Sequence, residues 1–180
     1  MEDGELIIFF EGSTDRDFLD KFIIPLIKKK YRNVEAKTIN ESSYPKIKSI
    51  IANAKIRQID YIFITDLDNE KCLVKKKEKL AKKFGEDPTN NEIVIVCYEL
   101  ESWLYAGLGK NGCNRLALPY YDNTDGMTKE KFYDLGGERN YSKVKMKSLV
   151  KQEFKIKNAI KCNNSFRYFY EKYLPEDCFF

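Results

Sequence analysis

The sequence predicts an α/β fold with a mainly parallel four-stranded sheet that is flanked by helices. Short runs of apolar, β-forming residues alternate with helical segments through the first hundred residues. Strands that alternate with helices are joined by right-handed crossovers, which make neighbouring strands parallel. From Tyr141 onward the pattern is helical again, so we expect a helical C-terminal extension over about residues 106–180.

Hydrophobic spacing predicts the first two strands and the helix between them. Residues 5–10, ELIIFF, form a short buried-strand run. Apolar residues then recur at helical spacing over residues 18–27, and Pro25 should kink this helix or mark its last turns. Residues 34–40, VEAKTIN, alternate like a second strand.

The same reasoning predicts the remaining elements of the sheet. A second helix follows Pro45, and the third strand is YIFIT at residues 61–65. A third helix covers residues 69–85 and ends at its final glycine. The fourth strand is EIVIVCY at residues 92–98, and another helix starts with the segment ESWLYAGLG.

The composition predicts one folded domain. The chain has 180 residues, 43% hydrophobic and 14% aromatic, which is enough for a single domain with a hydrophobic core. The acidic start is unlike a signal peptide, and no stretch is apolar for long enough to span a membrane. Five cysteines without a C-x-x-C pair indicate reduced thiols, so we expect a cytoplasmic protein.

Histidine is absent from the sequence, and this restricts the chemistry. Its absence excludes Ser-His-Asp hydrolysis, Cys-His proteolysis and any mechanism with a histidine base or nucleophile. Catalysis would have to rely on carboxylates, lysines, tyrosines or a metal bound through oxygen. The net charge of +4 is compatible with a polyanionic partner.

Carboxylates follow three of the predicted strands at their carboxyl ends. They are Glu11 after the first strand, Asp66 and Asp68 after the third, and Glu99 and Glu101 after the fourth. In a parallel sheet these ends share one edge, which is where α/β proteins form their sites. Clustered carboxylates repel one another unless a cation neutralises them, and Mg²⁺ (or Mn²⁺) prefers such oxygen ligands. The sequence therefore predicts a metal site that is suited to phosphate-ester chemistry.

A plainer interpretation of these acids remains open. An Asp at a strand end, such as Asp68, can cap the next helix or close a turn, and Glu11 alone could be a surface acid. The combination of Glu-Gly after the first strand and Asp-x-Asp after the third is harder to explain in this way.

Two motifs resemble those of Toprim domains: FFEGSTDRDFL at residues 9–19 and IFITDLDN at residues 62–69. The resemblance covers about residues 5–105 and implies a compact Rossmann-like core there that binds Mg²⁺, as in topoisomerases, primases and several nucleases. It implies Glu11 as the general acid/base or first metal ligand, with Asp66 and Asp68 as metal ligands.

A narrower resemblance extends over nearly the whole chain. The blocks YELESWLYA (residues 98–106) and NNSFRYFYEKYL (residues 163–174) are similar to small stand-alone Toprim-like proteins of prokaryotes, which are related to the overcoming-lysogenisation-defect nucleases. This resemblance implies that Glu99 and Glu101 lie beside the metal site.

Lysines are concentrated in two parts of the chain. Seven of them, with a single acid, lie between Lys143 and Lys161. The nuclease branch of the Toprim group uses a C-terminal basic residue to stabilise charge on the phosphate, which makes Lys143, Lys145 and Lys147 candidates and Lys145 the representative one. A second group lies on the third helix, where we expect first a solvated face and second a role in steering phosphates: Lys75, Lys76, Lys77, Lys79, Lys82 and Lys83.

These patterns favour a Mg²⁺-dependent nuclease that cleaves phosphodiesters in DNA or RNA. The resemblance also implies a context in prokaryotic defence or a mobile element, where a separate partner protein could supply an ATPase. A non-catalytic Toprim module that binds nucleic acid or protein is an alternative, as is a metal-dependent nucleotidyl or glycosyl transferase. A phosphatase with a nucleophilic Asp fits less well, because its Asp-x-Asp should follow the first strand.

Overall fold

The computed structural model describes residues 2–40, 43–67, 70, 72–86, 93–96 and 99–174. The chain divides into two compact units, one that runs to Ile95 and takes in Tyr173 and Leu174, and one that spans Val96–Lys172. The boundary between them falls inside the core that the sequence predicts over residues 5–105.

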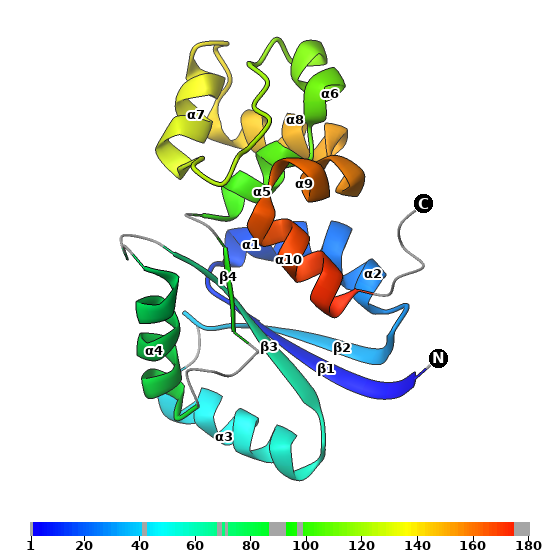
Figure 1. The fold of residues 1–180 in the computed structure, drawn as a ribbon, viewed down its shortest axis with the longest axis vertical. Helices are drawn as coiled ribbons and strands as arrows, with labels where there is room; N and C mark the ends of the chain where they lie inside the picture. Colours follow the sequence, from blue (N-terminus) through cyan, green and yellow to red (C-terminus); the bar gives the residue numbers. More distant parts are fainter. Residues whose placement is uncertain are drawn as a thin grey trace. The chain divides into compact units, whose positions relative to one another are not determined.

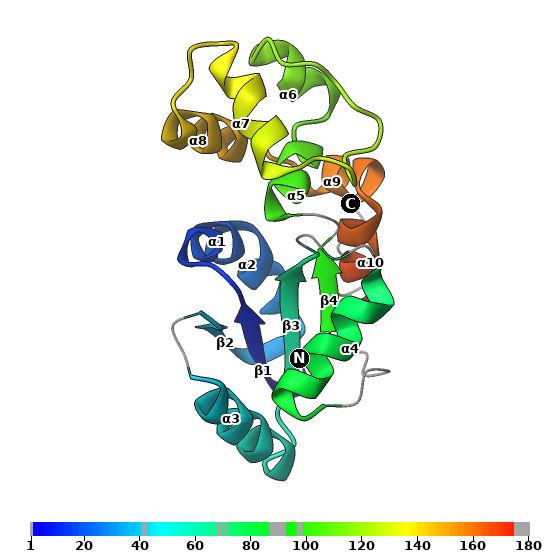
Figure 2. The same cartoon turned by 90° about the vertical axis from the view of Figure 1, so that its left-hand side faces the viewer.

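The first unit is built on a four-stranded parallel sheet. Its strands are β1 (Glu2–Phe10), β2 (Tyr31–Thr38), β3 (Asp60–Asp66) and β4 (Ile93–Val96). Their order across the sheet is β2-β1-β3-β4, and β1 pairs in parallel with both of its neighbours. Figure 2 shows the arrows of β1, β3 and β4 pointing the same way. This confirms the predicted α/β class and is compatible with a Rossmann-like fold.

One continuous helical stretch connects β1 to β2. It comprises α1 (Ser13–Phe18), a π-helical turn η1 (Leu19–Ile23) and α2 (Ile24–Ile27). The Ile24 N–H donates to the carbonyl of Leu19, five residues back. The π-helical turn ends two residues before Pro25, which has no backbone N–H to donate in the i→i−4 hydrogen-bond pattern of an α-helix. The sequence prediction that Pro25 marks the last turns is confirmed, because the helix ends two residues later.

Helices α3 (Tyr44–Ile56) and α4 (Leu73–Phe84) cover one face of the sheet (Figure 1). Alternate strand residues point toward them and form the core, with Phe63 of β3 stacked between Phe9 of β1 and Phe84 of α4 at ring-centroid distances of 4.8 Å. The intervening strand residues, such as Ile8 and Ile62, are buried on the opposite face, on the side of α1 and α2.

Gly85 ends α4, as the sequence predicts, and its backbone has a φ of 77°. We expect Gly85→Ala to lower the free energy of unfolding by about 1–2 kcal/mol, because an L residue is strained in this conformation. An added Cβ would meet only Lys48 Cε at 4.0 Å, so the cost should be conformational. Urea unfolding measures it, with Gly137→Ala as the control, since that site is open and has no positive φ. Equal effects would contradict the conformational explanation.

The second unit is helical, which confirms the predicted helical extension. Its helices are α5 (Leu100–Ala106), α6 (Gly109–Arg115), α7 (Lys129–Gly137), α8 (Lys143–Glu153), α9 (Ile156–Cys162) and α10 (Asn164–Tyr173). All seven residues of α5 are buried, and this helix contacts α7, α8 and α9. The second unit is therefore organised around the ESWLYA segment.

Trp103 lies in the interior of the second unit. Its indole N–H donates to Ser165 Oγ at 2.8 Å, and its ring packs against Phe166 and Phe169 of α10. Both of those rings are buried as well, so the late aromatic segment mainly supplies core residues. Tyr168 is the exception, with 44% of its surface exposed.

Two further sequence expectations can be compared with the structure. In the part of the chain that is described, the helices are too short and too polar for any of them to cross a membrane. Three of the five cysteines lie in this part, and all three are free thiols: Cys72, Cys113 and Cys162. Burial raises the pKa of Cys113 to about 11, so this thiol stays protonated at neutral pH.

Candidate functional site at the carboxyl edge of the sheet

The carboxyl ends of β1 and β3 bring Glu11 and Asp66 to neighbouring positions. The two strands are parallel and hydrogen-bonded, and the last residue of β1, Phe10, is paired with Ile64. Glu11 follows one residue beyond this pair and Asp66 two residues beyond it. Adjacent strands are about 4.8 Å apart, so both carboxylates start from the same small area of the edge.

A pocket of about 230 Å³ opens beside Glu11. Its walls come from the ends of β1 and β2, including Ile39 and Asn40, and from one side of α4. Helix α4 contributes three cations to the lining: Lys76, Lys79 and Lys83. All of these residues belong to the first unit. The pocket thus combines one carboxylate with a surplus of positive charge.

Lys76 forms an ion pair with Glu11 in this pocket. Its ammonium lies 3.8 Å from Glu11 Oε1, and only 9% of its side chain is exposed. The charge pattern of this helix predicts a solvated face, and for Lys76 that prediction is wrong. A signal was present, because Lys76 is spaced by four and eight residues from Leu80 and Phe84, which are buried on the core side of α4.

The other two lysines of the pocket also have neighbours of their own. Lys79 donates to Glu70 Oε1 at 2.7 Å, and this hydrogen bond lowers the pKa of the Glu70 carboxyl. Lys83 lies 4.2 Å from the centre of the Tyr44 ring. Glu70, two residues after Asp68 in the sequence, is thereby linked to α4.

The donor set at this edge fits a magnesium ion. Mg²⁺ is usually held by one or two carboxylates and keeps several waters, and Glu11 with Asp66 can supply that number from adjacent strands. Asp68 lies outside the described residues. Within the described ranges there is no group of three or more carboxylates and cysteines close enough to hold a metal. Of the predicted metal ligands, the described part of this edge contains Glu11 and Asp66, and their role as ligands remains a prediction.

Glu99 and Glu101 lie in the second unit, at the start of α5. Glu101 is buried and hydrogen-bonded to Lys147 Nζ at 2.9 Å and to the Tyr133 hydroxyl at 3.3 Å. Glu99 accepts a hydrogen bond from the backbone N–H of Lys129, at the first residue of α7. Burial raises the pKa of Glu99, and the nearby charge of Glu101 adds to this effect. Glu101 thus has a cationic partner inside the protein, and its role as a metal ligand remains a prediction.

The three candidate lysines of α8 lie in different environments. Lys143 and Lys145 are exposed, and the Lys145 ammonium lies 4.9 Å from the centre of the Tyr141 ring. Lys147 is mostly buried beside Glu101. Burial opposes its charge, but the hydrogen bond and the charge of Glu101 prevail and raise the pKa of Lys147. A catalytic role for Lys145 remains a prediction.

Comparison with known proteins adds no relative: no protein-family model matches the chain, and no curated protein or solved structure matches it. The fold and the edge site define an α/β protein with a parallel sheet, two strand-end carboxylates and a lysine-lined pocket.

Proposed function

We propose that the protein is a Mg²⁺-dependent nuclease of the Toprim type, which cleaves phosphodiester bonds in DNA or RNA at the carboxyl edge of the first unit. The observation that supports this most directly is the register of β1 and β3, which places Glu11 and Asp66 at adjacent strand ends. This is the arrangement that the two sequence motifs imply when each follows its strand.

The lysines of α4 give the pocket a second property that the proposal needs. A phosphodiester is an anion, and a site made of carboxylates alone would repel it. Lys76 and Lys79 place positive charge at the wall of the pocket that holds Glu11. In the proposed reaction Glu11 exchanges a proton with the attacking water or the leaving oxygen, and Lys76 stabilises the negative charge on the phosphate oxygens. A bound Mg²⁺ would supply electrophilic activation of the phosphate.

Metal titration of Asp66→Asn/Asp68→Asn tests the proposal. We expect Mg²⁺ or Mn²⁺ to stabilise the wild-type protein in a saturable way, with a rise in melting temperature that the double variant loses. Asp60→Asn is the matched control, because Asp60 begins the same strand and accepts a hydrogen bond from the Tyr31 hydroxyl. Equal metal responses in wild type and the double variant would remove the basis for a metal site at this edge.

A module that binds nucleic acid without cleaving it is the second candidate. The ion pair of Glu11 with buried Lys76 favours it, since a lysine beside the carboxylate reduces the need for a metal. A nuclease assay in Mg²⁺, run beside a binding assay in chelator, separates the two functions. Binding without any cleavage by the wild-type protein would favour the module.

A further inference from the structure

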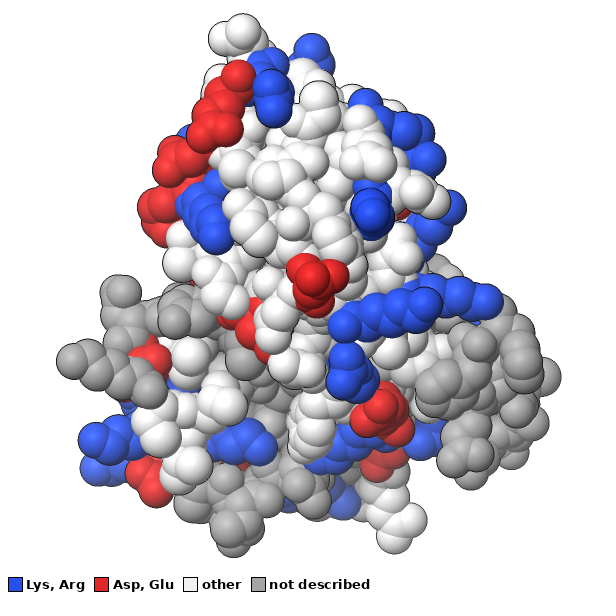
Figure 3. Space-filling view, turned by 45° about the horizontal axis from the view of Figure 1, so that its top comes forward, with Lys and Arg blue, Asp and Glu red and all other residues white. Residues whose placement is uncertain are grey.

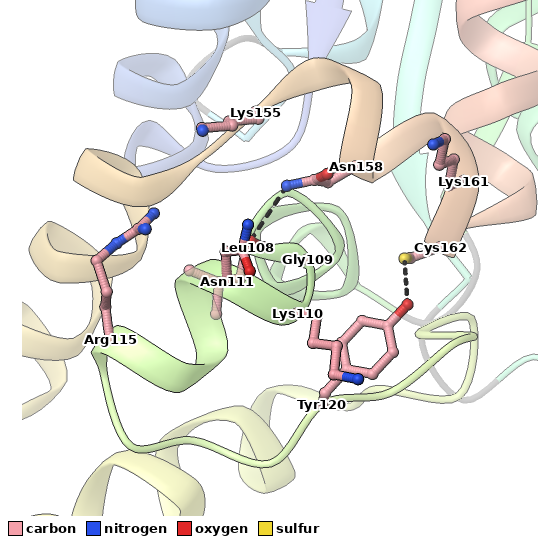
Figure 4. Close-up of a pocket in the computed structure, with 10 residues that line it drawn as sticks. All are labelled: Leu108, Gly109, Lys110, Asn111, Arg115, Tyr120, Lys155, Asn158, Lys161 and Cys162. Carbon is pink, nitrogen blue, oxygen red and sulfur yellow. Dashed lines mark hydrogen bonds between the residues drawn. The ribbon is translucent and has the colours of Figure 1, made fainter.

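The second unit contains a pocket of about 270 Å³ that the proposed function does not use (Figure 4). It lies between the start of α6, the segment around Tyr120, and α9. All of its lining residues belong to the second unit, so the pocket is defined without reference to the sheet.

The floor of this pocket is fixed by close packing between Gly109 and Asn158. The Asn158 amide donates to the carbonyls of Gly107 and Leu108, at 3.1 Å each. Gly109 has a φ of +56°, and a Cβ at this position would come within 2.5 Å of the Asn158 amide nitrogen. Only glycine allows Asn158 to pack this closely, so this packing defines the floor of the pocket without a bound ligand.

One wall of the pocket is an aromatic ring. Tyr120 has 39% of its surface exposed, and its hydroxyl lies 3.6 Å from Cys162 Sγ (Figure 4). The hydroxyl end of the ring is thus held in place by Cys162, while part of the ring is accessible to solvent. A ring in this position can stack against a planar group such as a nucleobase.

The rim of the pocket is positively charged. Lys110, Arg115, Lys155 and Lys161 line it, and no carboxylate is among its described lining residues. Arg115 is paired with Glu153, with Nε 2.9 Å from the carboxylate, so the net positive charge comes from the three lysines. On the face of the molecule that Figure 3 shows, Lys and Arg side chains are interspersed with Asp and Glu side chains.

We propose that this pocket binds one nucleotide unit of a single-stranded nucleic acid, with the phosphate at the lysine rim and the base against Tyr120. Lysine ammonium groups bind phosphate as point charges, and stacking on an exposed aromatic ring accepts any base. This binding needs no metal and does not depend on the cleavage proposed for the first unit.

The test is the affinity of the full chain for a fluorescent single-stranded oligonucleotide, measured in chelator so that cleavage cannot occur. We expect Lys155→Glu/Lys161→Glu to weaken binding by about tenfold or more, and to make the salt dependence shallower by about 0.7 per lost phosphate contact. The double variant reverses two charges, so its effect is compared with that of a single-charge control on a logarithmic scale, per reversed charge. The control is Lys157→Glu, because Lys157 is an exposed lysine of α9 outside the pocket. It should weaken binding several-fold less.

Variants of Tyr120 test the aromatic wall. Tyr120→Ala should weaken binding by about fivefold or more, whereas Tyr120→Phe keeps the ring and should bind like the wild-type protein. An effect of Lys155→Glu/Lys161→Glu that is no larger per reversed charge than that of Lys157→Glu would overturn the proposal. A second result would also overturn it: the double variant loses binding of a mononucleotide or of inorganic phosphate, but binds the oligonucleotide as tightly as the wild-type protein does.

Discussion

Replacing Glu11 with glutamine is expected to lower Mg²⁺-dependent phosphodiester cleavage by about 10²- to 10⁴-fold, which is the usual contribution of a general acid or base. Glutamine has nearly the shape of glutamate, but it cannot exchange a proton and is a weaker metal ligand. Single-turnover cleavage of a labelled DNA or RNA strand measures the effect. Binding of the uncleaved strand should persist, because the lysines that line the same pocket are retained.

The control for this experiment is Glu5→Gln. Glu5 lies in the first half of β1, the strand that Glu11 follows, and its carboxylate is 3.8 Å from the Arg57 guanidinium. The charge change is identical, so a general electrostatic effect would appear in both variants. If Glu11→Gln cleaves as fast as the wild-type protein, Glu11 has no part in proton transfer and the proposed reaction is wrong.

Replacing Lys147 with methionine is expected to lower the free energy of unfolding by about 3–5 kcal/mol. The reason is that Glu101, with 4% of its side chain exposed, would keep a buried charge without its cation. The Tyr133 hydroxyl could still donate to Glu101, but a neutral hydrogen bond replaces only part of the lost interaction. Urea unfolding at neutral pH measures the change.

Two further variants test whether the unpaired charge of Glu101 causes this loss of stability. Lys145→Met changes an exposed lysine of the same helix and should alter stability by less than about 1 kcal/mol. Glu101→Gln/Lys147→Met removes both charges and should recover most of the stability. If Glu101 is instead a metal ligand, as its position after a strand predicts, Mg²⁺ should stabilise Lys147→Met more than it stabilises the wild-type protein.

The pH dependence of the Lys147 effect follows from the direction of its pKa shift. Glu101 raises the pKa of Lys147 above its ordinary 10.5, so the folded state holds this proton more tightly than the unfolded state does. The resulting stabilisation is fully present below the unfolded value and is lost as the pH rises through the folded one. The difference between Lys147→Met and the wild-type protein should therefore stay constant from pH 7 to pH 9 and shrink in stronger alkali.

Local patterns determined the fold class and most element positions. The apolar runs predicted β1 and β3, Gly85 predicted the end of α4, and helical spacing predicted α3 after Pro45. Each of these features depends on residues that are close in sequence, so periodicity and backbone preference are enough to predict them. The parallel direction of the strands followed in turn from the alternation of strands and helices along the chain.

The sequence by itself therefore determined the α/β fold, the helical second half and the placement of Glu11 and Asp66 at strand ends. Only the tertiary structure decided which cation each carboxylate meets. Lys76 reaches Glu11 across 65 residues of sequence, and Lys147 reaches Glu101 across 46. The pocket near Tyr120 likewise combines α6 with α9. The physical reason is that side-chain periodicity specifies which face of a helix is buried, whereas packing of the whole chain selects the groups that the face meets.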